Sequence, residues 1–158
     1  MASHQNKGLN PLSNRAKSNE RPKIRLDNQL CFALYTASNT VGQHYHTLLK
    51  AHDITYSQYL VLMALAEEDG ISISALASRL EVSKATMTPM LRRLEVKGLL
   101  TREIQEGNER QKIVALTNEG HSAWAKCCDV SLDVFERTGL SADEAQEVIR
   151  ICAKIARN

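Results

Sequence analysis

The spacing of the apolar residues changes near Gly98, and this change constrains the fold more than any other feature of the sequence. Before Gly98 the apolar residues recur at spacings of three and four, which is typical of amphipathic helices. After Gly98, residues 99–106 and 111–116 have the pattern of two strands, joined by Glu106-Gly107-Asn108, a favourable turn sequence. The chain is therefore predicted to be mainly helical, with one small β-hairpin.

Six helices are expected around this hairpin. In the first, Asp27 either caps the helix or lies in its first turn, and Gly42 marks a kink or a close backbone approach. The helix before Gly98 contains Pro89, and we expect it to begin at Ser83 nonetheless, with a local distortion. Ser141 and Glu144 form a capping box for the last helix. The expected helices cover residues 26–52, 56–68, 73–80, 83–97, 117–137 and 141–157.

Length and composition indicate one cytoplasmic domain after a tail. Residues 1–23 are basic and poor in apolar residues, so we expect a disordered tail, followed by a single domain over residues 24–158. The four cysteines have no C-x-x-C spacing, and no secretory signal precedes them. No apolar run approaches the ~20 residues that a membrane span needs. We expect a soluble protein with reduced thiols and no membrane partner.

The order of the middle elements predicts a nucleic-acid-binding fold. A helix, the three-residue turn Glu81-Val82-Ser83, a second helix and a hairpin form the layout of a winged helix-turn-helix domain. The second helix of such a pair enters the major groove of double-stranded DNA, where hydroxyl and cationic side chains suit phosphates and base edges. The candidate DNA contacts are Ser83, Lys84, Thr86, Thr88, Arg92, Arg93, Arg110 and Lys112, with Lys97 as a further candidate for the DNA backbone.

The positive charge is local, as DNA binding requires. The formal net charge of the whole chain is only +2, but residues 72–112 hold eight Lys or Arg against five Glu. The excess of three in this segment is larger than that of the chain, so the remainder is slightly acidic. A solvated helix face would also carry such charges, and the case for DNA rests on the charges and the winged layout together.

The first and last helices have broad apolar stripes, and we expect the winged core to be too small to cover both. DNA-binding domains of this kind usually pair, so that two recognition helices reach successive major grooves of a pseudo-palindromic operator. We therefore expect a homodimer joined by residues 26–52 and 118–157, with residues 55–117 binding DNA. The alternative is that both stripes pack on their own chain.

Cys31 is a candidate reactive thiol because it lies near the start of the first helix. A helix amino end favours negative charge and so the nucleophilic thiolate, and Tyr35 shares the same face four residues on. Tyr45 is fourteen residues beyond Cys31, about 21 Å along a straight helix. It cannot touch Cys31 of its own chain, whereas an antiparallel partner could bring the two together. The alternative is that Cys31 is a small buried hydrophobe.

The sequence from Leu26 to the end resembles the MarR family of transcriptional regulators. Its decapeptide LDNQLCFALY, residues 26–35, resembles the start of the organic-hydroperoxide-sensing (OhrR-type) members, and residues 54–60 and 88–91 are further marks of that branch. The resemblance implies a repressor, not an enzyme, which needs no cofactor and releases DNA when organic peroxide oxidises Cys31 to a sulfenic acid. It also implies a sensor pocket in which Tyr45 and Tyr56 reach Cys31 from the partner subunit, with Tyr35 nearby.

The sequence departs from that branch at the second thiol. In two-cysteine members a resolving cysteine lies near the junction of the last two helices, but residues 135–140 contain none. The nearest are Cys127 and Cys128, of which at most one faces a given target, because adjacent helical residues point about 100° apart. A disulfide between subunits and capping by a low-molecular-weight thiol both stay open. Cys152, on the apolar face of the last helix, is expected in the core.

Two further departures concern DNA contacts. The segment 81–85 differs from the usual hydroperoxide-sensor sequence, which leaves the operator preference open. Asn108 stands where the family commonly has Asp two residues before the wing arginine, which removes an ion pair that would orient Arg110.

Three other functions compete with this interpretation. A MarR-type regulator could be released by a small aromatic ligand, with Cys31 silent. A metal sensor would use His44, His46 and His52, but helical residues two apart point about 200° from one another, so His44 and His46 cannot chelate together. A thiol peroxidase would turn over peroxide without affinity for DNA, and the basic residues of the wing argue against it.

Overall fold

The computed structural model describes residues 25–105 and 108–157, and for residues 105 and 108–111 it describes the backbone alone. The expected basic tail lies outside the described residues, so its extent stays a prediction. The chain divides into two compact units at the Thr40–Val41 peptide bond.

The first unit contains a 3₁₀ turn, η1 (Leu26–Asn28), and the first half of helix α1 (Leu30–Leu49). The sequence had suggested that Asp27 caps the first helix or lies in its first turn. This prediction is wrong, because α1 begins at Leu30. It lies in η1, with its carboxylate 3.8 Å from the Arg25 guanidinium. None of the described side chains of this unit is buried.

The second unit begins with the end of α1, a 3₁₀ turn and three short helices. Each of these helices is capped by the hydroxyl of the residue before it: Thr55, Ser72 and Ser83 accept hydrogen bonds from the backbone N–H three residues on. The expected early start of the helix that contains Pro89 is confirmed, because this helix begins at Lys84 with Ser83 as its cap. A Cβ atom at Gly42 would meet nothing within 4 Å, so no described backbone approaches this glycine closely. The elements are η2 (Lys50–His52), α2 (Tyr56–Glu67), α3 (Ile73–Arg79) and α4 (Lys84–Val96).

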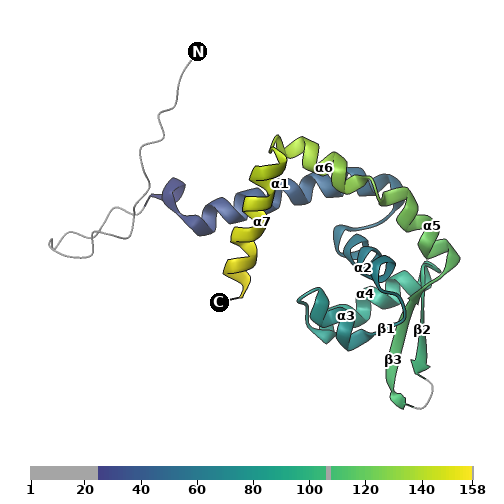
Figure 1. Cartoon of the computed structure of the whole chain (residues 1–158). Helices are drawn as coiled ribbons and strands as arrows, with labels where there is room; N and C mark the ends of the chain where they lie inside the picture. The colour runs from purple at the N-terminus through teal and green to yellow at the C-terminus, as the bar shows by residue number, and fades with distance from the viewer. Residues whose placement is uncertain (1–24, 106–107, 158) are drawn as a thin grey trace. The chain divides into compact units, whose positions relative to one another are not determined.

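A three-stranded antiparallel sheet completes the winged helix-turn-helix (Figure 1). The expected hairpin consists of β2 (Leu100–Gln105) and β3 (Asn108–Leu116), with Leu100 opposite Leu116. The sequence did not predict β1 (Ile71–Ser72), which pairs with β3 through Ile71 opposite Val114. Two residues are too few for a strand periodicity, and β1 exists because β3 supplies its partner.

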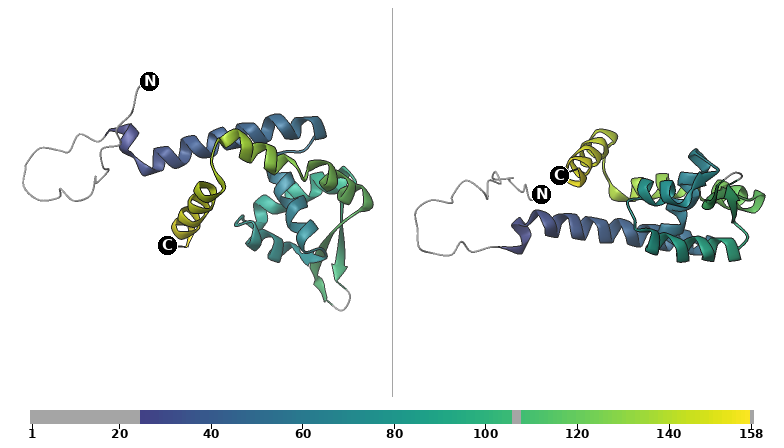
Figure 2. Two further views of the ribbon diagram at one scale, coloured as in Figure 1. Left: turned by 45° about the horizontal axis from the view of Figure 1, so that its top comes forward. Right: turned by 90° about the horizontal axis from the view of Figure 1, so that it is seen from below.

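The predicted long helix over residues 117–137 is wrong, because the structure has two helices there. These are α5 (Asn118–Cys127) and α6 (Val130–Thr138), with a break at Cys128–Asp129. Gly139, at a φ of 69°, ends α6 in the left-handed region that glycine tolerates. The chain then changes direction into α7 (Ala142–Ala156), as the views of Figure 2 show. The predicted capping box of Ser141 and Glu144 is confirmed.

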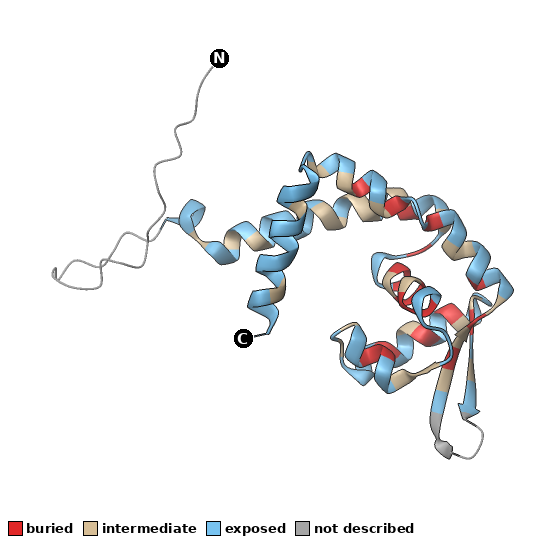
Figure 3. Cartoon of the chain, viewed as in Figure 1, coloured by how far each residue is buried: buried red, intermediate tan, exposed pale blue. Residues whose placement is uncertain are grey.

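Helix α7 buries none of its side chains, and almost all of it is exposed in Figure 3. Val148 and Ile149 are 48% and 67% exposed, and Ile151 and Ile155 are exposed as well. Cys152 is exposed on this helix, so its predicted place in the core is wrong. The pattern of α7 is amphipathic, but no described part of the chain covers its apolar face.

The core lies in the second unit, between α2, α3, α4, the sheet and the helices that follow it (Figure 3). Aromatic residues make up only 4% of the sequence, and aliphatic side chains dominate the core. Its fully buried members include Leu62, Leu65, Leu76, Leu91, Leu94 and Val114. This core fixes α3 and α4 against the sheet and so presents the outer face of α4 to solvent.

Candidate nucleic-acid interface and thiol site

The amino end of α4 presents the polar residues that the sequence singled out. Ser83, Lys84, Thr86 and Thr88 are all exposed, whereas Met87 between them is fully buried. Burial of Met87 against the core orients this turn, because one apolar side chain points inward and its polar neighbours point out. These four side chains can therefore contact a molecule that binds to the amino end of α4.

The hydroxyl groups of this turn have distinct hydrogen-bonding capacities. Thr88 Oγ1 donates its proton to the Lys84 carbonyl oxygen at 2.8 Å, so it can only accept from a ligand. Ser83 Oγ and Thr86 Oγ1 lie 2.9 Å apart and share one hydrogen bond, which leaves one free proton between them. The turn thus offers an acceptor suited to base amino groups and a donor suited to phosphate oxygens.

Ion pairs separate the cations near α4 into two groups. Lys97 Nζ binds the Asp53 carboxylate at 2.9 Å and also donates to the Asp53 carbonyl oxygen, which ties the end of α4 to the loop before α2. Arg102 binds Glu95, and its hydrogen bond lowers the pKa of that carboxyl. Four exposed cations make no ion pair with another described residue and stay available for phosphates: Lys84, Arg92, Arg93 and Lys112.

The wing is only partly described. Lys112 is exposed on β3, but the side chains of Asn108 and Arg110 lie outside the described residues. The expectation that Arg110 enters a minor groove therefore stays a prediction.

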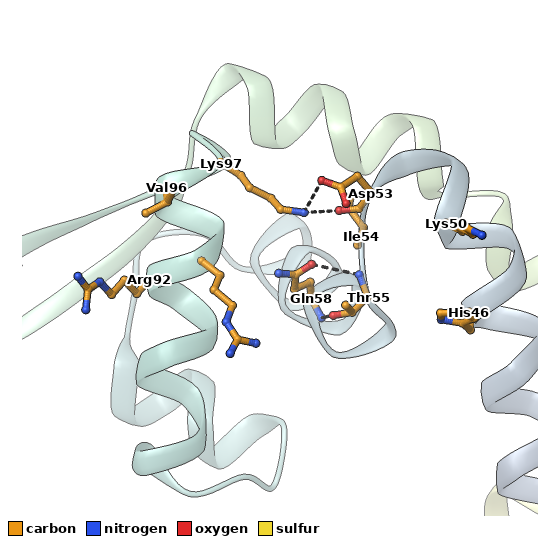
Figure 4. A pocket seen from close by; sticks show the side chains of 10 residues that line it. His46, Lys50, Asp53, Ile54, Thr55, Gln58, Arg92, Val96 and Lys97 are labelled. Atoms are coloured by element: carbon orange, nitrogen blue, oxygen red, sulfur yellow. Dashed lines mark hydrogen bonds and ion pairs between the residues drawn. The ribbon is translucent and has the colours of Figure 1, made fainter.

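A cavity of about 580 Å³ lies between α4 and the segment that joins α1 to α2 (Figure 4). Arg92, Val96 and Lys97 extend from α4 on one side, and His46 and Lys50 lie across from them. The base contains Ile54, beside the Thr55–Gln58 hydrogen bond of the α2 cap. The lining is completed by Asp53, Thr55, Gln58 and Arg93, so the charged groups that line the cavity are mainly cations, beside apolar surface.

Three tyrosines and a tryptophan, contributed by α1, α2 and α5, form an aromatic cluster. The ring centroids of Tyr45 and Tyr56 are 4.4 Å apart, and those of Tyr45 and Tyr59 are 5.6 Å apart. Tyr59 also lies 5.6 Å from Trp124 of α5. The sequence had connected Tyr45 with Tyr56 but missed Tyr59, which lies three residues after Tyr56 and so on the same helical face.

The environment of the cluster keeps its phenols protonated. Burial raises the pKa of Tyr45 to about 12, and the neighbouring Tyr56 and Tyr59 add to the effect. Burial also raises the pKa of Tyr56 and of Tyr59. At neutral pH these side chains are hydrogen-bond donors, which suits them to a thiolate.

The four cysteines differ in access. Cys31 is the second residue of α1 and is exposed, as is Tyr35 at 64%. Both lie in the first unit, whereas Tyr45 and Tyr56 lie in the second. Cys127 is buried, while Cys128 and Cys152 are exposed. The structure thus removes the alternative of a buried Cys31 within one chain.

The described residues give no support to two other kinds of site. No three His, Cys, Asp or Glu side chains of residues 25–105 and 108–157 converge in a way that could hold a metal ion, and this includes His44, His46 and His52. In the same part of the chain, no helix combines the length and the apolar content that crossing a bilayer requires.

Comparison with known proteins gives the family. A model of the MarR family matches residues 54–112. The HTH-type transcriptional regulator SarZ of Staphylococcus haemolyticus is 35% identical over 133 residues, which cover 84% of this chain and 90% of SarZ. The chain belongs to the MarR family. The winged helix-turn-helix fold predicted from the sequence is the fold of this family's DNA-binding regulators, and it is confirmed.

Two more relatives of this MarR protein are informative. The HTH-type transcriptional regulator TtmR of Methylorubrum extorquens is 40% identical over 124 residues, which span 78% of this chain but only 64% of TtmR. AbfR, solved in reduced form bound to DNA, is 36% identical with a TM-score of 0.71, and the match covers 84% of this chain and 92% of AbfR. AbfR has also been solved with a disulfide formed, at 35% identity and a TM-score of 0.61 over 84% of this chain and 88% of AbfR. These matches are to transcriptional regulators and not to enzymes.

Proposed function

We propose that this MarR-family protein is a redox-sensing repressor of the organic-hydroperoxide branch. In this proposal a homodimer binds a pseudo-palindromic operator in double-stranded DNA and leaves it when an organic hydroperoxide oxidises Cys31. The observation that carries the redox part is the contact between Tyr45 and Tyr56, whose rings lie 4.4 Å apart. The resemblance requires these two phenols to meet at one thiol pocket.

The DNA part of the proposal rests on the outer face of α4. Its first turn combines an acceptor-only hydroxyl at Thr88 with the exposed cation of Lys84, and Arg92 and Arg93 follow without ion-pair partners among the described residues. Such a face can bind base edges with its amino end and phosphates with its later turns. The structure of reduced AbfR bound to DNA is consistent with this use.

The dimer part rests on apolar surface that the described chain leaves open. In α7, Val148 and Ile149 are exposed, and in the first unit Leu30 is 62% exposed. An exposed apolar stripe of this kind is typical of a surface that a partner covers. A symmetric dimer would cover it in both protomers and place two α4 helices about one turn of DNA apart.

The thiol part rests on protonated phenols and on the length of a helix. Because burial raises the pKa of Tyr45 to about 12, its hydroxyl donates a hydrogen bond to a thiolate at neutral pH. Residues fourteen apart on a straight helix are separated by about 21 Å. In this proposal the Tyr45 hydroxyl therefore donates its hydrogen bond to Cys31 of the partner subunit. The reduced and disulfide forms of AbfR are in keeping with a redox role in this family.

The proposed switch begins with attack of the Cys31 thiolate on the peroxide O–O bond. The sulfur takes the terminal oxygen to become a sulfenic acid, and the other oxygen leaves as the alcohol after taking a proton. Loss of the thiolate weakens its hydrogen bonds to the two phenols. The dimer helices then shift, and the two recognition helices lose their spacing on the operator. A cytoplasmic location, beside the DNA, belongs to this proposal.

The direct test is release of operator DNA from the reduced full-length protein. Addition of stoichiometric cumene hydroperoxide is expected to release the DNA in a fluorescence anisotropy assay, and a thiol reductant is expected to restore binding. Phenolic compounds without an oxidant should leave the complex intact. Release by phenolic compounds and not by peroxide would contradict the redox part of the proposal.

The cationic cavity favours a second candidate, a MarR-type regulator released by a small aromatic ligand with no redox role for Cys31. Its volume of about 580 Å³ lies within the roughly 300–1,000 Å³ of small-molecule sites. Arg92 and Lys50 could bind an acidic group, and Ile54 could pack on a ring. The phenolic arm of the release assay decides between the two candidates.

We expect Arg92→Ala to reduce the salt dependence of operator binding, because Arg92 has no ion-pair partner among the described residues. Loss of one phosphate contact lowers the slope of log affinity against log salt by about 1. Lys97→Ala is the matched control on the same helix, since Lys97 already binds Asp53. Its slope should stay close to that of the wild type, and equal slopes for all three proteins would contradict a phosphate contact at Arg92.

A further inference from the structure

Tyr59 contacts each of the other members of the aromatic cluster. Its ring centroid lies 5.6 Å from that of Tyr45, 6.5 Å from that of Tyr56 and 5.6 Å from that of Trp124. These distances lie within the range of about 4.5–7 Å at which aromatic rings attract one another. Tyr59 of α2 therefore joins a ring of α1 to a ring of α5.

Two features fix the position of the Tyr59 ring. The side chain is fully buried, and a ring in a close-packed interior cannot move without moving its neighbours. Its backbone follows directly after the capping box of α2, in which the side chains of Thr55 and Gln58 each accept from the backbone N–H of the other. The Tyr59 ring is therefore rigidly supported, whereas Tyr56 is 39% exposed and Tyr45 is only partly buried.

The hydroxyl of Tyr59 takes no part in this support. It is buried and makes no hydrogen bond to another described residue. Burial raises the pKa of Tyr59, and the Ser131 hydroxyl is near enough to lower it in part, but the two hydroxyls do not meet in hydrogen-bond geometry. A buried donor without a partner costs stability. Packing of the ring, and not a polar contact, therefore accounts for the position of Tyr59.

We propose that Tyr59 is a positioning residue of the redox sensor, whose buried ring holds the Tyr45 and Tyr56 phenols in the arrangement that meets Cys31. This inference rests on the proposed function, in which the two phenols donate hydrogen bonds to the thiolate of the partner subunit. The Tyr45 ring comes from α1 and the Tyr56 ring from α2, and Tyr59 packs on both. Without the Tyr59 ring the two phenols lose their shared support, and the thiolate loses aligned donors.

The same ring connects the sensor phenols with α5. Because Tyr59 contacts both Tyr45 and Trp124, a shift of the phenols on oxidation moves the Trp124 ring as well. Helix α5 lies directly against the segment that follows α4, since a Cβ atom at Gly120 would collide with the Leu99 carbonyl group. Movement of Trp124 therefore reaches the end of α4. The sequence contains a single tryptophan, so tryptophan fluorescence reports this movement alone.

The test measures how fast cumene hydroperoxide oxidises Cys31 in the reduced full-length protein. Samples are quenched with an alkylating reagent, and peptide mass spectrometry gives the fraction of Cys31 that is no longer a free thiol. Tyr59→Leu removes the ring and should lower the second-order rate constant by roughly tenfold or more, because small misplacements around a reacting atom are costly. Tyr59→Phe keeps the ring and should oxidise as fast as the wild type. Unchanged operator affinity of the reduced variants shows that the DNA-binding fold is intact.

Val61→Ala is the matched control for loss of packing in α2. Val61 is also fully buried, but helical residues two apart point about 200° from one another, so it faces away from Tyr59. This variant should lose stability without slowing the oxidation of Cys31. A rate lowered as much in Val61→Ala as in Tyr59→Leu would assign the effect to general loss of packing and overturn the inference.

Trp124 emission is the second measurement, and it needs no variant that lacks the ring. In the wild type and in Tyr59→Phe the emission should change in step with oxidation of Cys31, whereas in Cys31→Ser it should stay constant. Emission that stays constant in the wild type while Cys31 is oxidised would show that Tyr59 does not connect the phenols with α5. That result overturns the inference even if Tyr59→Leu does not fold.

The remaining outcomes separate this inference from the proposed function. Oxidation of Tyr59→Leu as fast as that of the wild type overturns the inference, although the proposed function would survive. So does a Tyr59→Phe protein as slow as Tyr59→Leu, because the hydroxyl and not the ring would then be responsible. If Tyr59→Leu cannot bind the operator, Tyr59→Met, which fills much of the buried space without a planar ring, replaces it in the rate measurement. If Cys31 of the wild type does not react with hydroperoxide, the proposed function fails and this inference fails with it.

Discussion

Cys31→Ser is expected to bind operator DNA as tightly as the wild type and to keep it in the presence of hydroperoxide. Serine preserves the size of the side chain, so the reduced-like state is retained, but its hydroxyl is not a nucleophile toward peroxide. For the wild type, oxidation should weaken operator affinity by roughly 5–150-fold, the usual range of coupling between two sites. The measurement is operator affinity by anisotropy before and after treatment with cumene hydroperoxide.

Cys152→Ser is the matched control for this experiment. It replaces another exposed cysteine and should respond to peroxide as the wild type does. A Cys31→Ser protein that still releases DNA on oxidation would show that another group senses the peroxide. Should this variant fail to bind DNA at all, Tyr45→Phe and Tyr56→Phe provide a second approach. Each removes only a hydroxyl, and their peroxide response should weaken if the phenols hold the thiolate.

Gly120→Ala is expected to destabilise the fold by about 3 kcal/mol or more, which is large for a single methyl group. A Cβ atom at Gly120 would lie 1.9 Å from the Leu99 carbonyl oxygen and 3.2 Å from Leu116 Cδ2. The Leu99 carbonyl cannot easily move, because it accepts a hydrogen bond from Thr117 N at 3.2 Å. Thr117 in turn donates to the Gly98 carbonyl oxygen at 2.6 Å and caps α5. The clash therefore pushes α5 away from Leu99, which follows shortly after the end of α4.

Urea denaturation at one protein concentration measures this effect, since the stability of a dimer depends on concentration. Ser122→Ala is the control, because Ser122 is exposed two residues later on the same helix. It should change the free energy of unfolding by no more than about 0.5 kcal/mol. Equal stability of Gly120→Ala and Ser122→Ala would mean that α5 can shift away from Leu99 without loss.

Local signals in the sequence determined most of the fold. Hydroxyl residues at Thr55, Ser72, Ser83 and Ser141 cap the helices that follow them, and each acts on a backbone N–H three residues away. The change of apolar spacing after Gly98 predicted the β2–β3 hairpin, and this signal is also local. A motif of this kind is complete within one turn or one strand, so the sequence is sufficient to predict it. The exposed polar turn at the start of α4 was predictable for the same reason.

Part of the candidate site was also predictable. Tyr45 and Tyr56 were connected through the family resemblance, and the structure brings their rings together. Tyr59 was missed, although its spacing of three from Tyr56 was visible in the sequence. The sequence placed Cys152 in the core because α7 is amphipathic, but amphipathicity indicates only that one face prefers burial. It does not say whether the same chain or a second copy covers that face.

The sequence by itself determined the class of fold, the starts of the helices that Thr55, Ser72, Ser83 and Ser141 cap, and the residues that face outward at the start of α4. Only the tertiary structure decided that Lys97 is held by Asp53 while Arg92 is not, that Cys127 is buried while Cys128 is open, and that Gly120 can bear no side chain. The physical reason is the range of the interactions. Caps and periodicity act over three or four residues, whereas these features depend on atoms that folding brings together from distant positions, such as Asp53 and Lys97 or Leu99 and Gly120.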